Sequence, residues 1–142
     1  PYGGKFSGAI ARNPWCTFLG PLDRGRLRDE LAAASLLVLP SFEDNCPMAV
    51  LEAAAAGTPV AAAKIGGIPD HIDHGRTGLL FDPQDPEAIR AAVASLLDDP
   101  AAAGRMADTA RREAREKFSC SAVARRHLEI YAEVLGKGST AA

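Results

Sequence analysis

Short apolar runs alternate along the chain with segments of helical length. The runs occupy residues 15–20, 35–40, 58–63 and 77–81, and each of them contains a Gly or a Pro. Runs of this length bounded by such residues are typical of buried strands. Because parallel strands need crossover connections that are usually helical, the alternation predicts an α/β fold in which a four-stranded parallel sheet is flanked by helices.

Capping residues delimit two helices between these runs. The first is predicted over residues 23–34, with Asp23 as its N-cap. The second is predicted over residues 46–56, between Asn45 as N-cap and Gly57 as a left-handed C-cap, because Gly adopts positive φ without steric cost.

The last third of the chain is predicted to be helical. Asp85 as N-cap and Pro86 at the first helical position begin one helix. A second, more exposed helix covers residues 100–118, and Ser119 or Ser121 caps a third. That third helix carries one mainly apolar face, made of Val123, His127, Ile130, Tyr131 and Val134.

Composition describes an ordinary folded protein of one domain. The chain has 142 residues, of which 47% are hydrophobic and 24% charged, so it is long enough to bury a core. We expect a domain over residues 1–135 and a flexible tail over residues 136–142. The net charge of −2 gives no basic field and disfavours a nucleic-acid partner.

Cysteine usage and the N-terminus bear on location. Three widely spaced cysteines form no disulfide framework, which favours a reducing compartment and predicts a cytoplasmic protein. The chain contains no apolar stretch of membrane-spanning length and no signal-peptide pattern. It begins without Met in a Gly-rich segment, so we expect that it is truncated at its N-terminus.

The loops that follow the strands are the expected binding edge, because ligands of open α/β sheets lie outside the carboxyl ends of the strands. A helix start with free N–H groups follows residues 40–47, and the Gly66-Gly67 turn follows the next strand. Both features suit a phosphate group. The Gly-Gly pair is also explained by a plain structural turn.

Three carboxylates lie near that edge. Glu52 follows Asn45 by two helical turns, so both side chains project from nearly the same side of the helix. Glu43 and Asp44 precede the helix. Carboxylates beside a phosphate site can accept hydrogen bonds from the hydroxyls of a ribose or a hexose, which predicts a sugar nucleotide. A solvated acidic helix face is the alternative.

These motifs together resemble the donor-binding half of GT-B glycosyltransferases of the family-four type. The segments LPSFEDNCPMAVLEAAAAGTPVAA and GGIPDHIDHGRTGLLFDPQDPEAI match its Glu-x7-Glu motif and the Gly-Gly and Thr-Gly stretches that follow. The resemblance implies a Rossmann-like sheet, the C-terminal half of a GT-B fold. It also implies that Glu52 binds the nucleotide ribose and that Asp44 contacts the transferred sugar.

The remaining contacts follow from the same resemblance. The helix start at Asn45 and Cys46 and the turn at Gly66 and Gly67 are the implied diphosphate contacts. Asp replaces the family's Glu at position 44, which shortens the side chain by about 1.5 Å, so Glu43 is a second candidate for the sugar. Lys64 and Arg76 are basic residues that could reach the diphosphate from the rim. No residue is a convincing general base, and no metal site or cofactor is implied.

The implied activity is retaining transfer of a sugar from UDP or GDP to an acceptor hydroxyl, in polysaccharide or glycoconjugate biosynthesis. The family's basic pair and its N-terminal acceptor domain lie upstream of residue 1, so we expect this chain alone to be inactive. Peripheral membrane association through the missing domain is compatible with this reading. The alternatives are a nucleotide-sugar epimerase of the same architecture and a non-catalytic interaction module.

Overall fold

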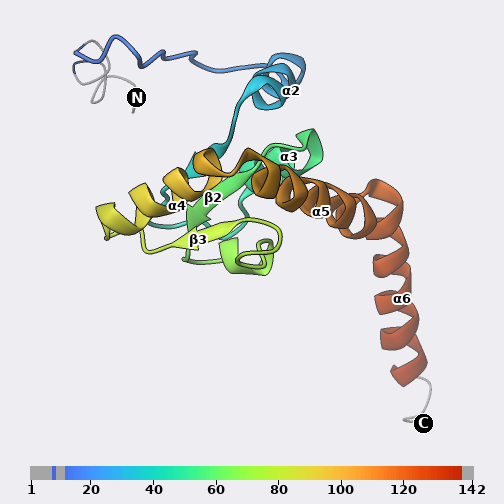
Figure 1. The fold of residues 1–142 in the computed structure, drawn as a ribbon. Helices are drawn as coiled ribbons and strands as arrows, with labels where there is room; N and C mark the ends of the chain where they lie inside the picture. Colours follow the sequence, from blue (N-terminus) through green and yellow to red (C-terminus); the bar gives the residue numbers. More distant parts are fainter. Residues whose placement is uncertain (1–7, 9–11, 139–142) are drawn as a thin grey trace.

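A parallel sheet of three strands organises the chain (Figure 1). The computed structural model describes residue 8 and residues 12–138. The strands are β1 (Leu37–Leu39), β2 (Val60–Ala63) and β3 (Leu79–Phe81), in the order β1-β2-β3. Both neighbouring pairs are parallel, so all three carboxyl ends meet at one edge of the sheet. The predicted α/β class is confirmed.

Helices connect and follow the strands. α3 packs on β1 and β2, α4 packs on β2 and β3, and α5 packs on both of these helices. α2 lies beside α3 and α6 continues from α5. The bounds of these elements are α2 Arg24–Ala33, α3 Met48–Ala56, the 3-10 helix η1 Ile68–Asp70, α4 Pro86–Asp98, α5 Pro100–Phe118 and α6 Cys120–Gly138.

The core lies around the central strand. All four residues of β2 are buried, and three of them are alanines with no exposed surface. Their small side chains let the neighbouring helices approach the sheet closely, and Val50 of α3, Ile68 of η1 and Phe81 of β3 fill the space around them. The apolar area that these residues remove from water is the main stabilising contribution.

Four of the predicted helix caps are confirmed. Asp23 accepts a hydrogen bond from the Arg26 amide at 2.9 Å, and Asp85 accepts from the amides of Glu87 and Ala88. Gly57 ends α3 with a φ of 84°. Ser119 accepts from the Ala122 amide at 3.3 Å and caps α6.

The strand predicted over residues 15–20 is wrong. This segment has no strand structure and leads, away from the sheet, toward α2 (Figure 1). Trp15 is 81% exposed and Phe18 is 66% exposed. A strand needs a neighbour to accept its backbone hydrogen bonds, and in the described part of the chain the sheet ends at β1, which pairs with β2 alone. An apolar run without a ladder partner stays extended and unpaired.

α6 extends away from the rest of the molecule (Figure 1). It continues to Gly138, whereas the tail was predicted from residue 136, and residues 139–142 lie outside the described residues. The predicted apolar face is largely uncovered, with Tyr131 at 58% exposure and Val134 at 64%. Within the described residues, no helix is both long enough and apolar enough to pass through a bilayer.

Candidate functional site

Two loops at the carboxyl edge of the sheet are locked together by their backbones. The Gly67 amide donates to the Asp44 carbonyl at 2.9 Å. A Cβ atom on Gly66 would lie 2.2 Å from the Asp44 carbonyl oxygen, and one on Gly67 would lie 2.3 Å from that of Asn45. Gly66 also has a φ of 55°, a backbone conformation that residues other than Gly rarely adopt. The Gly-Gly turn is therefore required by the contact between the loops.

Asp44 is the better fixed of the two carboxylates proposed for the sugar. Its Oδ1 atom accepts from the Cys46 amide at 3.1 Å, which closes an Asx turn, and its carbonyl is held by Gly67. Asp44 is half-buried, whereas Glu43 is exposed. Within the described residues Glu43 has no hydrogen bond or ion pair. The geometry therefore favours Asp44 as the preorganised group.

The helix after this loop starts later than predicted. α3 begins at Met48, its N-cap is Pro47, and no side chain caps it, so the prediction of Asn45 as N-cap is wrong. The residue before a proline is disfavoured in the helical region, and Asp44 has already bound the Cys46 amide. Asn45 and Cys46 are exposed loop residues beside the helix start, and Pro47 is fully buried.

Glu52 lines a cavity between α2, α3 and α5. The cavity has a volume of about 630 Å³, within the usual range for small-molecule sites. Glu52 is half-buried, and within the described residues it has neither a hydrogen bond nor an ion pair. The other lining residues are Arg24, Leu27, Arg28, Leu31, Ala32, Met48, Ala55, Ala56 and Arg111.

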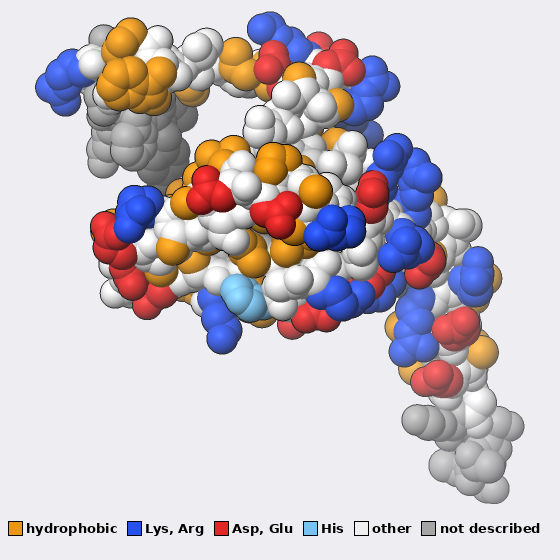
Figure 2. Space-filling view, viewed as in Figure 1, with side chains coloured by type: hydrophobic (Ala, Val, Ile, Leu, Met, Phe, Trp, Pro, Cys, Tyr) orange, Lys and Arg blue, Asp and Glu red, His pale blue; other side chains and the backbone are white. Residues whose placement is uncertain are grey.

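The cavity suits a ligand that has both apolar surface and hydrogen-bonding groups. Leu27, Leu31 and Met48 give apolar surface, Glu52 gives a hydrogen-bond acceptor, and three arginines give donors. Lys and Arg side chains gather over α2 and α5 with acidic residues among them (Figure 2). The arginines of the cavity were not predicted as site residues. The sequence indicates two of them, because Arg24 and Arg28 are spaced with two leucines on one face of a helix.

The predicted site residues fall into two neighbouring groups. Asp44, Asn45, Gly66 and Gly67 meet where the two loops touch. Glu52 lies one helical turn after Met48, and both line the cavity, which none of the loop residues does. The first turn of α3 thus separates the loop group from the cavity that Glu52 faces.

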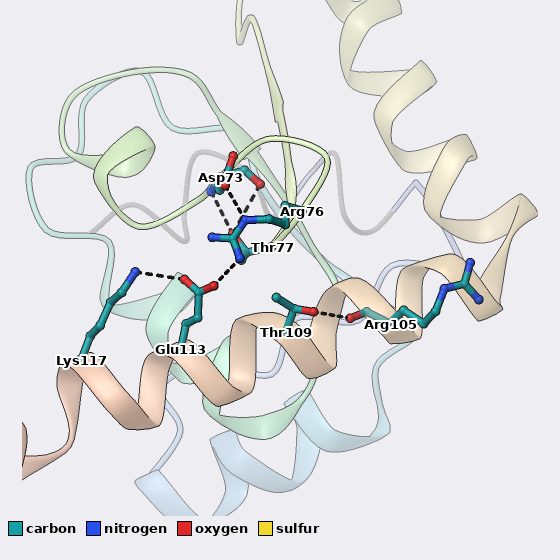
Figure 3. Close-up of polar contacts among 7 residues, drawn as sticks. All are labelled: Asp73, Arg76, Thr77, Arg105, Thr109, Glu113 and Lys117. Atoms are coloured by element: carbon teal, nitrogen blue, oxygen red, sulfur yellow. Dashed lines mark hydrogen bonds and ion pairs between the residues drawn. The ribbon is translucent and has the colours of Figure 1, made fainter.

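Arg76 is engaged elsewhere. Its guanidinium donates to Asp73 and to Glu113 of α5, and Lys117 donates to the same Glu113 at 3.0 Å (Figure 3). These contacts lower the pKa of Glu113 to about 2, with the hydrogen bond from Arg76 as the larger cause, and raise the pKa of Arg76. The network ties residues 73–77 to α5 and occupies the guanidinium group of Arg76. Lys64 is exposed and has no ion pair within the described residues.

Two histidines near this network have structural contacts. His74 accepts the Leu80 amide through Nδ1 at 2.9 Å, and this bond joins its loop to β3. The His71 ring packs against Phe118 with centroids 5.2 Å apart. Its Nδ1 atom is buried and has no partner in the described part of the chain.

Comparisons with known structures define the fold class first. The chain superposes on the sucrose-phosphate synthase of Thermosynechococcus elongatus with a TM-score of 0.85 and 29% identity, over 94% of this chain and 34% of that one. HepE of Anabaena, in complex with UDP-glucose, gives a TM-score of 0.83 at 23% identity, over 93% of this chain and 37% of that one. The predicted Rossmann-like C-terminal half of a GT-B fold is confirmed.

The sequence comparison then gives the family. Residues 5–99 match Glycosyl transferases group 1, and the chain belongs to that family. The D-inositol 3-phosphate glycosyltransferase of Streptomyces avermitilis is 40% identical over 80% of this chain and 24% of that protein. The chain thus spans about a quarter of the length of such curated relatives.

Proposed function

We propose that the chain is the donor-binding domain of a retaining glycosyltransferase. The intact enzyme transfers a sugar from a nucleoside diphosphate, UDP or GDP, to an acceptor hydroxyl bound by a domain outside this chain. Membership of a transferase family supports this function over an epimerase or a non-catalytic interaction module. The similar D-inositol 3-phosphate glycosyltransferase and sucrose-phosphate synthase support it further.

The observation that carries the proposal is the carboxylate of Glu52 in the cavity, which has no partner among the described residues. A half-buried carboxylate has lost part of its hydration, and hydrogen bonds from a ribose diol would replace it. Each such bond to a charged acceptor contributes about 1.5 to 3 kcal/mol. Glu52 is therefore proposed to bind the ribose hydroxyls.

The loop group supplies the other end of the proposed ligand. Asp44 is proposed to accept hydrogen bonds from the transferred sugar, because its carboxylate is held by the Asx turn and its loop by Gly67. The backbone around Asn45, Cys46 and Gly66 is proposed to approach the diphosphate, next to the start of α3. This arrangement requires no metal ion, since helix starts and basic groups of the intact protein offset the diphosphate charge.

A nucleotide titration tests the proposal. We expect UDP or GDP to bind the chain in isothermal titration calorimetry, and Glu52→Ala to weaken binding by about 1.5 kcal/mol or more. Glu87→Ala is the matched control, because Glu87 is an exposed residue of α4 that pairs with Arg90 outside the cavity. Equal affinity of the Glu52→Ala protein and the wild type, with an unchanged circular dichroism spectrum, would remove the ribose role.

A further inference from the structure

The cavity beside Glu52 contains guanidinium groups that no contact within the described residues occupies. Arg28 is occupied, since it donates to Asp29 at 2.8 and 3.0 Å. Arg24 and Arg111 have no side-chain hydrogen bond or ion pair with any described residue. They are the donors of the cavity that remain available to a ligand.

The topology places these two arginines at opposite ends of the cavity. The chain passes from the C-terminus of α2 into β1, and the Thr58 hydroxyl at the start of β2 donates to the Leu31 carbonyl at 2.7 Å. The C-terminal end of α2 thus lies at the amino edge of the sheet, and Arg24 lies toward the carboxyl edge. Arg111 lies at the amino edge, because a Cβ on Gly57 would be 3.6 Å from its Cδ atom.

The order of the strands then gives the direction of the ligand. If Glu52 holds the ribose and the loop at Gly67 lies by the diphosphate, as proposed above, the nucleobase leaves the ribose on the side away from β2. That side is formed by α2 and the start of α3, where Leu27 of α2 and Met48 of α3 offer apolar walls to the flat faces of a base. At that end of the cavity Arg24 is a polar side chain with no hydrogen bond or ion pair to any described residue.

We propose that Arg24 selects the nucleobase of the donor. A guanidinium group only donates hydrogen bonds, so it complements the carbonyl oxygen of uracil or guanine. The amino groups of cytosine and adenine at the corresponding position are donors themselves, so they cannot accept a hydrogen bond from Arg24. This inference rests on the proposed function and deepens it, because it names the residue that recognises the keto group shared by uracil and guanine.

The comparison of UDP with CDP tests this interaction, because the two nucleotides share the ribose diphosphate and differ at one edge of the pyrimidine. There the O4 carbonyl and N3–H of uracil are replaced by the amino group and unprotonated N3 of cytosine. Titration calorimetry on the full 142-residue chain should give an affinity for UDP about tenfold or more above that for CDP. Arg24→Met should reduce the UDP affinity about tenfold and the CDP affinity less than threefold. Arg26→Met is the matched control, because Arg26 is on the same helix and does not line the cavity.

Each outcome separates this inference from the function on which it rests. If Arg24→Met lowers the UDP and CDP affinities equally, Arg24 binds the phosphates. If it changes neither affinity, Arg24 does not contact the nucleotide. Either result overturns base selection. Wild-type affinities that are equal for UDP and CDP, and for GDP and ADP, overturn it without any substitution. If no nucleotide binds, or if Glu52→Ala binds UDP as the wild type does, the proposed function itself fails.

Discussion

Replacing Gly67 with Ala tests whether the two loops depend on their close backbone contact. The new Cβ would lie 2.3 Å from the Asn45 carbonyl oxygen and 3.0 Å from its carbonyl carbon. Gly67 has a φ of −85°, so alanine brings no backbone strain, and the whole effect comes from separating the loops. Overpacking of this kind costs about 1 to 3 kcal/mol.

Separation of the loops would also break a hydrogen bond. The bond from the Gly67 amide to the Asp44 carbonyl contributes about 1 kcal/mol. The expected loss in the free energy of unfolding is therefore about 2 to 4 kcal/mol. Urea denaturation followed by circular dichroism measures it, since a change in midpoint at constant slope reports a change in stability.

Gly104→Ala is the control for this experiment. Gly104 is inside α5, and a Cβ there would meet nothing within 4 Å. Alanine at this position should raise stability by up to about 1 kcal/mol, because Gly is a poor helix former. Gly67→Ala should in addition weaken UDP binding. A Gly67→Ala protein that unfolds at the wild-type midpoint and binds UDP equally would refute the role given to the loop contact.

Two further predictions concern the packing around the site. The pKa of Glu113 is lowered to about 2 from an ordinary 4.5, which contributes stability above pH 4.5 that is lost as the pH falls toward 2. Glu113→Gln should flatten this decline when urea midpoints are measured at a series of pH values. An unchanged decline would contradict the network with Arg76. Thr58→Val removes the buried hydrogen bond to the Leu31 carbonyl and should cost about 1 kcal/mol of unfolding free energy, with wild-type stability as the contrary result.

Local chemistry made several elements predictable from the sequence. Asp85 followed by Pro86, and Gly57 after an alanine run, specify the end of a helix through atoms a few residues apart. Local residues could not show whether residues 15–20 form a strand, because a strand depends on a partner distant in sequence. The start of α3 was misplaced because the Asx turn of Asp44 competes with Asn45 as the local cap.

The candidate site was predictable in its parts and less so in its arrangement. Glu52 was found because it follows the loop residue Asn45 by two helical turns, and the structure places it in a cavity. Arg24 and Arg111 are 87 positions apart in the chain (111 minus 24), and they line the same cavity only through tertiary packing. The Gly-Gly turn was predicted, but its close contact with the backbone of Asp44 appears only when both loops are placed in space.

The most direct test of the account is a thermodynamic cycle between Glu52 and the ribose 2′-hydroxyl. UDP and 2′-deoxy-UDP are titrated into the wild-type chain and into Glu52→Ala. We expect loss of the hydroxyl to weaken binding to the wild type by about 1.5 kcal/mol and to Glu52→Ala by far less, a coupling of about 1 kcal/mol or more. Equal losses in the two proteins would contradict the assignment of Glu52 as the ribose-binding residue.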